Sequence, residues 1–324
     1  MFPDHREVTC TDPGTYGVLD ETWTTFLVVA RRRMECMVGL SSDRIVVVTG
    51  ASRGAGKGIA LALGETGAKV YVTGRTKTEG DAPLPGTVFA TAEEITRRGG
   101  TGVPVVLDHS DDAQVEAFFE RLREEHGRLD ILVNNALTVP DELTKKGPFW
   151  EKSLSLLDVL DVGMRSSYVS SYYAAPLLAA NGEGLVVNTS SFGGTCYMHG
   201  PAYGAGKAAV DKMAHDMAVD FRPFNVAVVS LWMGLLLTER TKAGFDANPG
   251  AYDGLAATAE SAEFPGRVID ALAKDPELMK RSGQVLVGAE VAQELGVTDL
   301  EGKQPPSHRP FLGNPPVFSD AVID

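Results

Sequence analysis

Short apolar segments alternate with longer segments of helical periodicity along most of the chain. The predicted buried strands are Arg44–Val48, Lys69–Thr73, Val103–Leu107, Ile131–Val133, Leu185–Asn188, Asn225–Leu231 and Gln284–Val287. The predicted helices are Gly56–Glu65, Thr91–Arg98, Ala113–His126, Leu154–Ala180, Ala202–Phe221 and Gly266–Ala273. Strands that alternate with helices of this length form βαβ units. The pattern therefore predicts an α/β fold in which helices cover both faces of a doubly wound parallel sheet of about seven strands.

The regular pattern occupies the middle of the chain. Residues 43–290 carry it and are expected to form a single domain, which includes an irregular stretch at 234–263. Residues 1–42 show neither a helical nor an alternating period, which predicts an N-terminal extension. Met37 lies just ahead of the first strand, so translation of the native protein could also begin there, in which case residues 1–36 would not belong to it. The Pro-rich residues 291–324 are expected to form a C-terminal tail.

The charge excludes two classes of partner. The 324 residues include 30 basic and 43 acidic ones, for a formal net charge of −13. Nucleic acids and anionic lipids bind clustered Lys and Arg, so neither is an expected partner. The apolar run Phe26–Ala30 is too short to span a bilayer, and Arg31–Arg33 follow it, whereas a signal peptide carries its basic residues first. We expect a cytoplasmic protein.

The first predicted strand leads into a glycine-rich turn, Thr49-Gly50-Ala51-Ser52-Arg53-Gly54-Ala55-Gly56-Lys57-Gly58. Glycines at this spacing let the backbone approach a pyrophosphate, which then lies at the N-terminus of the following helix. Such junctions also carry glycine for steric reasons alone, but a position directly after the first core strand favours a dinucleotide and a Rossmann-type sheet. The residues expected to contact the dinucleotide here are Gly50, Ser52, Arg53, Gly54, Ala55 and Gly56.

The end of the second strand favours NADP(H) over NAD(H). An acidic residue about 20 positions after the glycines would bind the ribose 2′-hydroxyl of NAD, and Thr73–Thr76 contains none. Arg75 and Arg53 would instead pair with a 2′-phosphate, unless both are simply solvated. Asp108, after the third strand, is expected to accept from the adenine amine or to cap a turn. Asn135, after the fourth strand, either contacts the ligand or stabilises its own turn.

A serine, a tyrosine and a lysine follow the fifth strand. Tyr203 and Lys207 are four residues apart and therefore share one helix face. A nearby ammonium and a cationic nicotinamide lower the pKa of a phenol from about 10, so that Tyr203 could exchange a proton with a substrate oxygen. A serine hydroxyl would orient that oxygen, and both Ser190 and Ser191 end the strand.

Neighbouring polar residues have simpler interpretations. Asp211 and His215 continue the spacing of Tyr203 and Lys207 and are expected on a solvated helix face. Cys196 and His199 have no third ligand nearby, so a packed loop is expected and no metal site. The three cysteines are widely spaced, which fits a reducing compartment.

In this order, the motifs resemble those of the single-domain short-chain dehydrogenases/reductases. The motifs that carry the resemblance are Thr49–Gly56, Gly74-Arg75, Asn134-Asn135-Ala136, Ser190-Ser191 and Tyr203–Lys207. Phe149-Trp150-Glu151 is similar to the dehydrogenase/reductase member 1 branch and its bacterial relatives. The resemblance implies that Tyr203 is the acid–base, that Lys207 holds the nicotinamide ribose, and that Ser191 binds the substrate oxygen. It also implies cofactor contacts for Gly234 and Thr238.

Two positions depart from the family pattern. An asparagine usually holds a relay water in the helix after the fourth strand, but Gly163 stands there, and Asp161 is the nearest polar residue. Met233 replaces the usual proline before Gly234. These departures leave open a catalytically inactive NADP(H)-binding sensor or scaffold. The complete serine, tyrosine and lysine set favours an NADP(H)-dependent oxidoreductase that interconverts a carbonyl and a secondary alcohol over that sensor. The short C-terminal portion is not expected to supply the larger substrate domain that related epimerases and dehydratases carry.

The small-molecule partner is expected to be an apolar or aromatic carbonyl compound. The segments expected to line its pocket, Leu137–Phe149, Phe192–Ala202 and the substrate loop Gly234–Glu263, contain several aromatic and aliphatic residues. The family resemblance further implies a homodimer or homotetramer formed through the helices Leu154–Ala180 and Ala202–Phe221.

Overall fold

A seven-stranded parallel sheet forms the centre of the protein in the computed structural model, which describes residues 44–248, 250 and 253–323. The strands are β1 (Ile45–Val48), β2 (Lys69–Gly74), β3 (Thr101–Val106), β4 (Ile131–Asn134), β5 (Gly184–Ser190), β6 (Val226–Trp232) and β7 (Val285–Val287). Their order, β3-β2-β1-β4-β5-β6-β7, reverses direction between β1 and β4. Such a reversal is where a parallel sheet opens a crevice for a ligand. The extension predicted at 1–42 lies outside the described residues.

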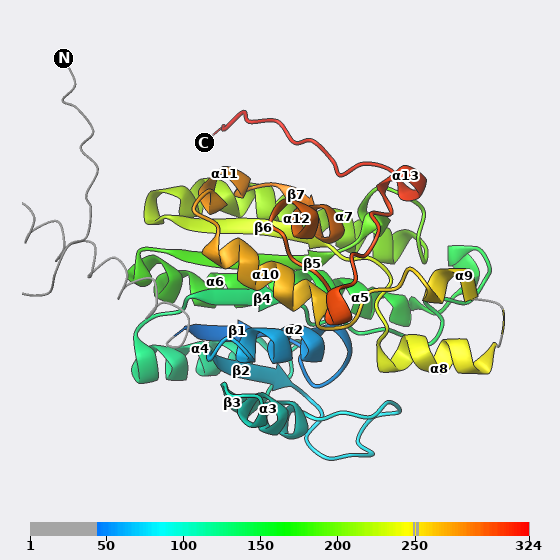
Figure 1. Ribbon diagram of the computed structural model, residues 1–324, viewed down its shortest axis with the longest axis horizontal. Coiled ribbons are helices and arrows are strands. Elements are labelled where there is room, and N and C mark those ends of the chain that lie inside the picture. The colour runs from blue at the N-terminus through cyan, green and yellow to red at the C-terminus, as the bar shows by residue number, and fades with distance from the viewer. Residues whose placement is uncertain (1–43, 249, 251–252, 324) are drawn as a thin grey trace, which may run out of the picture. The chain divides into compact units, whose positions relative to one another are not determined.

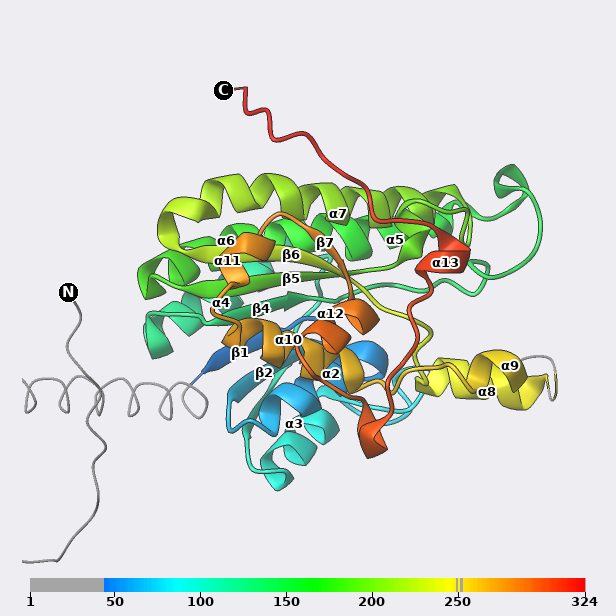
Figure 2. The same cartoon turned by 45° about the horizontal axis from the view of Figure 1, so that its top comes forward.

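Helices cover both faces of the sheet (Figures 1 and 2). One face is covered by α2 (Gly54–Gly64), α3 (Val88–Arg97), α10 (Phe264–Lys274) and α12 (Gly288–Glu294). The other face is covered by α4 (Asp112–His126), α6 (Ser166–Asn181) and α7 (Pro201–Phe221). The predicted doubly wound α/β sheet in a single domain is confirmed.

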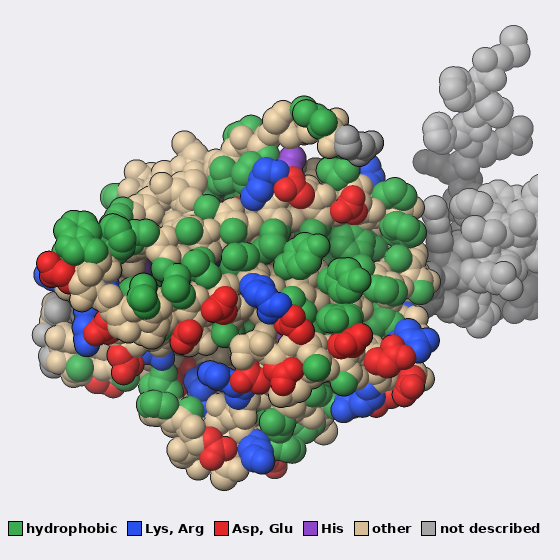
Figure 3. Space-filling model, turned by 180° about the vertical axis from the view of Figure 1, so that it is seen from behind, with side chains coloured by type: hydrophobic (Ala, Val, Ile, Leu, Met, Phe, Trp, Pro, Cys, Tyr) green, Lys and Arg blue, Asp and Glu red, His purple; other side chains and the backbone are tan. Residues whose placement is uncertain are grey.

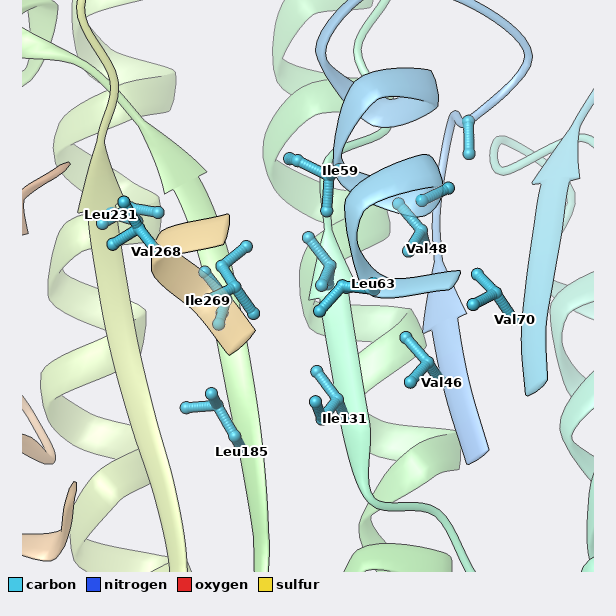
Figure 4. Packing of buried hydrophobic residues seen from close by; sticks show 14 of the residues in the cluster. Val46, Val48, Ile59, Leu63, Val70, Ile131, Leu185, Leu231, Val268 and Ile269 are labelled. Carbon is cyan, nitrogen blue, oxygen red and sulfur yellow. The ribbon is translucent and has the colours of Figure 1, made fainter. Parts of the chain in front are cut away.

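The β1 sequence Ile-Val-Val-Val explains how one strand serves two cores. Successive side chains of a strand point to opposite faces, so a strand buried on both faces is apolar throughout. Val46 and Val48 lie beneath α2, as Figure 4 shows, in a core cluster that residues of α10 also join, whereas Ile45 and Val47 belong to the opposite core. All four side chains are buried, which places the carboxyl end of β1 firmly beside that of β4.

The helix predicted at Leu154–Ala180 is present, but it is not uniform. The stretch is helical throughout and consists of a 3₁₀ turn, η2 (Leu154–Leu157), a short α5 (Asp158–Leu160), a π-helical turn, η3 (Asp161–Arg165), and then α6. Hydroxyls of two serines at the start of α6 donate back to the carbonyls of Val162 and Gly163, next to the π-helical turn. Apolar periodicity predicts a helix but does not distinguish a π-helical turn from a regular α-helical one, so the sequence gave no sign of it.

Two later segments approach the carboxyl edge of the sheet. The irregular stretch 234–263 contains α8 (Glu239–Ala247) and α9 (Asp253–Ala256), which lie beyond that edge (Figure 1). Residues 303–320, here called the C-terminal segment, return from the region after α12 toward α7, where His215 bonds the Ser319 carbonyl at 3.0 Å. The remaining short elements are η1 (Phe149–Glu151), η4 (Phe192–Gly194), η5 (Arg222–Phe224), α11 (Leu278–Arg281), η6 (Leu300–Gly302) and α13 (Arg309–Leu312).

Candidate active site

A cleft of about 800 Å³ opens at the carboxyl ends of β1 and β4. It brings together residues that the sequence singled out in seven separate segments. Those that line it are Gly50, Ser52, Arg53, Gly54, Ala55, Gly56, Arg75, Asp108, Asn135, Ser191, Tyr203, Lys207, Gly234 and Thr238. The predicted dinucleotide turn and the predicted catalytic group therefore share one cavity.

The glycine turn packs tightly against the residues that follow β4. Gly50 has a φ of +65°, and a β-carbon at this position would lie 2.7 Å from the Cα of Ala136. A β-carbon on Gly56 would lie 2.4 Å from the amide nitrogen of Asn135. That amide donates to the carbonyls of Thr49 and Gly50 at 2.9 and 3.2 Å. The Asn135 side chain thus holds the turn in place, and the turn with the N-terminus of α2 forms a cradle that fits a pyrophosphate.

An acidic residue that the sequence did not indicate meets this cradle. Glu239, the first residue of α8, accepts a hydrogen bond from the Gly54 amide at 2.9 Å. Thr238 caps α8 by accepting from the Thr241 amide at 3.2 Å. The sequence offered one signal for Glu239, namely its position directly after Thr238.

The two arginines that the sequence assigns to the adenosine end of a cofactor, Arg53 and Arg75, have different surroundings. The Arg53 guanidinium donates to the carbonyls of Pro85 and Gly86 and to the Thr76 hydroxyl, at 2.7 to 3.1 Å. Arg75 is largely exposed and lies 3.7 Å from an Asp108 oxygen. Arg53 therefore also fixes the loop between β2 and α3, whereas Arg75 keeps most of its donors free.

Ser191 and Tyr203 meet directly. The Ser191 hydroxyl oxygen lies 3.0 Å from the Tyr203 hydroxyl oxygen. Ser190 is fully buried instead, and its hydroxyl is directed to the Lys207 carbonyl at 3.4 Å. Of the two serines that the sequence left as candidates, Ser191 is the one beside the tyrosine, because neighbouring residues of an extended strand point to opposite sides.

Lys207 lies behind Tyr203 on the same helix. Its ammonium donates to the Thr189 carbonyl at 3.0 Å and lies 5.7 Å from the centre of the Tyr203 ring. Burial lowers the pKa of Lys207 to about 8, and the negative charge of Asp211 opposes that shift. Burial raises the pKa of Tyr203, while its hydrogen bond with Ser191 works in the opposite direction. Before any cofactor is considered, these protein groups keep Tyr203 protonated at neutral pH, so that it can act as a proton donor.

The expectation that Asp211 lies on a solvated face is wrong. Its side chain is fully buried and accepts from the Ser230 hydroxyl at 2.5 Å and from the Trp232 indole at 3.0 Å. Burial raises the pKa of Asp211, and these donors oppose the shift. His215 is half-buried beneath the C-terminal segment rather than solvated. Helix α7 packs against β5, β6 and η4, so residues that periodicity placed outside are covered.

At Gly163, where the family usually has the relay asparagine, the Leu137 side chain occupies the space that a larger residue would need. Gly163 lies in the π-helical turn η3, and a β-carbon there would lie 2.5 Å from the Leu137 side chain. A π-turn within a helix often marks a functional site. Asp161, the nearest polar residue in the sequence, lies in the same turn.

The floor and roof of the cleft contain residues that the sequence did not indicate. Glu260 does not line the cleft itself, but it is buried directly behind the cleft wall and accepts from the amide of Gly234, which does line it, at 3.1 Å. Burial raises the pKa of Glu260 to about 7. His308 and Leu312, both from the C-terminal segment, also line the cleft. No sequence motif connects these residues to the site, since each is brought there by tertiary packing alone.

The described part of the chain contains neither a cluster that could hold a metal ion nor a helix that could cross a membrane. Within residues 44–323, apart from the positions left out, no group of three or more His, Cys, Asp or Glu side chains is placed to hold a metal ion. Over the same residues no helix is both long enough and apolar enough to cross a membrane. Cys196 packs as a half-buried thiol against an apolar cluster around Phe192.

Comparison with known proteins agrees with this geometry. A family profile described as short chain dehydrogenase matches residues 44–248. Dehydrogenase/reductase SDR family member 1 from Mus musculus is 41% identical over 278 residues, which cover 82% of this chain and 86% of the mouse protein. Identity at this level over most of both chains extends beyond the cofactor motifs to the whole domain.

Solved structures share the architecture. A short-chain type dehydrogenase/reductase from Mycobacterium marinum is 26% identical, with a TM-score of 0.62 over 77% of this chain and 96% of its own. A protein assigned as a 2-deoxy-D-gluconate 3-dehydrogenase from Agrobacterium tumefaciens, whose structure contains NADP, is 24% identical. Its TM-score is 0.61 over 75% of this chain and 94% of its own, and at that identity the likeness concerns the fold.

Proposed function

The chain belongs to the short-chain dehydrogenase family, and from that membership we propose an NADP(H)-dependent oxidoreductase that interconverts a carbonyl and a secondary alcohol. One observation carries the proposal. The Ser191 and Tyr203 hydroxyls lie 3.0 Å apart in the cleft that also contains the glycine cradle. Two adjacent hydroxyls, one of them backed by a buried ammonium, form a site for a single carbonyl oxygen.

The residues divide the chemistry among them. The reduced nicotinamide supplies, when bound, the hydride that the carbonyl carbon receives. Tyr203 gives its phenolic proton to the carbonyl oxygen, and Ser191 donates a hydrogen bond that orients this oxygen. Lys207 stabilises the phenolate that remains, because its ammonium lies near the ring and is shielded from water. In the alcohol-oxidising direction the same phenolate accepts the hydroxyl proton.

Conversion of Tyr203→Phe tests this proposal. The variant should lose about 10²- to 10⁴-fold in kcat, measured as NADPH oxidation with a panel of ketones and aldehydes. Its Kd for NADPH, measured by fluorescence titration, should stay within about twofold of wild type, since the ring is retained. Tyr168→Phe, on an exposed tyrosine of α6, is the matched control. A wild-type protein that binds NADPH tightly but reduces no carbonyl would favour the inactive sensor instead, for which Gly163 is the motivating observation.

The preference for NADP(H) rests on Arg75. Its guanidinium is exposed at the adenosine end, and no acidic side chain follows β2 to bind a ribose 2′-hydroxyl. Arg75→Ala should weaken NADPH binding by roughly 10-fold or more and leave NADH binding nearly unchanged. Arg222→Ala, at an exposed arginine of η5, is the control. Equal losses for both dinucleotides would contradict the preference.

A homodimer or homotetramer is part of the proposal. A groove of about 620 Å³ lies on the face formed by α4, α6 and α7, where hydrophobic side chains gather in Figure 3. Tyr172 of α6 is 64% exposed beside it. Exposed apolar patches of this kind mark association sites. Tyr172→Lys should reduce the molar mass measured by light scattering after gel filtration, whereas Tyr197→Lys on another face should not.

A further inference from the structure

A second, smaller cavity adjoins the cleft. It measures about 100 Å³ and is walled mainly by apolar side chains. The residues used below are Phe149, Leu154, Leu156, Tyr197, His199 and Ala202, all of which line it. We call this cavity the side pocket. Nothing in the proposed reaction so far uses it.

His199 separates the side pocket from the reacting centre. Of the described residues, His199 is the one that lines both cavities. Its ring stands edge-on to the Tyr203 ring, with 5.2 Å between the ring centres. Its backbone has a φ of +58°, which a residue other than glycine rarely adopts.

The apolar surface continues from one cavity to the other. Leu156 and Ala202 of the side pocket belong to one packed cluster with Tyr203. Leu137 and Val139, which line the cleft, belong to the same cluster. A molecule whose carbonyl oxygen reaches Tyr203 therefore meets apolar surface on the side where His199 stands.

The residues on the outer rim of the side pocket are apolar and yet strongly exposed. Leu154 is 81% exposed and Tyr197 is 82% exposed, and Phe149 lies beside them. Single exposed apolar residues are ordinary, but several around one hollow next to an active site indicate a surface that a ligand covers. Burial of such surface contributes about 0.8 kcal/mol for each methylene group.

We propose that the side pocket binds an apolar arm of the carbonyl substrate, so that the preferred substrates are ketones or aldehydes with an extended alkyl or aryl group. The inference rests on the proposed oxidoreductase function and names its substrate class. Ser191 and Tyr203 hold the oxygen, and the arm passes His199 to lie against Leu154, Leu156 and Tyr197. Short carbonyl compounds leave this surface uncovered and are poorer substrates.

A homologous series of 2-alkanones tests the proposal. In the wild type, kcat/KM should rise from 2-butanone to 2-octanone by about twofold or more for each added methylene before it levels off. Leu154→Ser and Tyr197→Ser should each lower the ratio of kcat/KM for 2-octanone to that for 2-butanone by about threefold or more. Leu300→Ser, a matched change at another exposed leucine that lines neither cavity, should leave this ratio unchanged.

Direct binding separates failure of the side pocket from failure of the proposed function. Affinity of the NADPH complex for each ketone is measured by calorimetry, without any need for turnover. A protein that turns over ketones with no dependence on chain length, or whose ratio is the same in both serine variants, overturns the side pocket and leaves the oxidoreductase. A protein that reduces no ketone, yet binds 2-octanone more tightly than both variants do, overturns the oxidoreductase and supports the side pocket.

Discussion

The carboxylate of Glu239 accepts a hydrogen bond from the backbone amide of Gly54, with 2.9 Å between the two atoms. Gly54 is the first residue of α2, where free amides and the positive end of the helix dipole favour an anion. Under the proposed function, the cofactor pyrophosphate uses the same helix end. Glu239 and the pyrophosphate would therefore compete for one anion site, and binding of the dinucleotide there requires the Glu239 carboxylate to leave the Gly54 amide.

Glu239→Gln should tighten NADPH binding. The neutral amide competes less well for the helix N-terminus than the carboxylate, and a charge at such a position contributes about 0.3–1 kcal/mol. The expected decrease in Kd is about two- to fivefold, measured by titration of NADPH fluorescence. Asp246→Asn removes a charge from an exposed position of the same helix and should not change the Kd. An unchanged or weaker affinity of Glu239→Gln would show that the carboxylate does not obstruct the cofactor.

Gly56→Ala should damage the cradle and the fold together. The new methyl group would lie 2.4 Å from both the Asn135 amide nitrogen and the Gly50 carbonyl oxygen. Relief of such an overlap costs about 1–3 kcal/mol of unfolding free energy, measured with urea. Gly244→Ala, within α8, has no neighbour within 4 Å and should stabilise the protein slightly, because alanine favours helix. Equal stabilities for the two variants would contradict the close approach at Gly56.

Asp211→Asn should narrow the pH range of activity on the alkaline side. The pKa of Lys207 is lowered to about 8 by burial, and Asp211 is the charge that holds it up. Without that charge Lys207 loses its proton at lower pH, and the Tyr203 phenolate loses its support. The fall of kcat/KM with rising pH should therefore begin at lower pH than in the wild type. Asp216→Asn, an exposed carboxylate of the same helix, should keep the wild-type profile.

Glu260→Gln should change how stability depends on pH. Burial raises the pKa of Glu260 from 4.5 to about 7, so the folded protein binds this proton more tightly than the unfolded chain does. The native state consequently loses about 3 kcal/mol as pH rises from about 4.5 to 7, and glutamine avoids this loss. Urea unfolding should show that the free energy of unfolding of the variant, relative to that of wild type, is higher at pH 8 than at pH 5. A constant difference between the two proteins would contradict the raised pKa, and Glu301→Gln, at an exposed site, serves as control.

The sequence predicted those features that follow from local periodicity and chain order. The strands are buried on both faces, so continuous apolar runs such as Ile45–Val48 identified them. The glycine turn and the Tyr203–Lys207 pair were recognisable because their geometry depends on fixed local spacing. Parallel topology then requires the ends of β1, β4 and β5 to meet, which brought these motifs into one cleft.

Features that depend on packing between distant segments were beyond the sequence. Asp211 looked solvated because charged residues on a helix usually are, yet α7 is covered at that point by β6 and η4. His308, which lines the cleft, and Glu260, which supports Gly234 from behind, carry no motif and are placed there only by the path of the chain after β6. The π-helical turn at Asp161–Arg165 lies within a stretch correctly predicted to be helical, and hydrophobic spacing does not encode that change in helix type.

The C-terminal segment has a consequence for how the site is made in the cell. Translation releases the N-terminal part of a chain first, and folding begins there. The glycine cradle, Ser191, Tyr203 and Lys207 all leave the ribosome before His308 and Leu312, which supply part of the cleft wall. A nascent chain still attached to the ribosome can therefore hold its cofactor residues and its acid–base group while the cleft wall is incomplete. Full discrimination among substrates therefore waits for the C-terminal segment, and a released chain truncated after residue 304 should bind NADPH but discriminate less among carbonyl compounds than the full chain does.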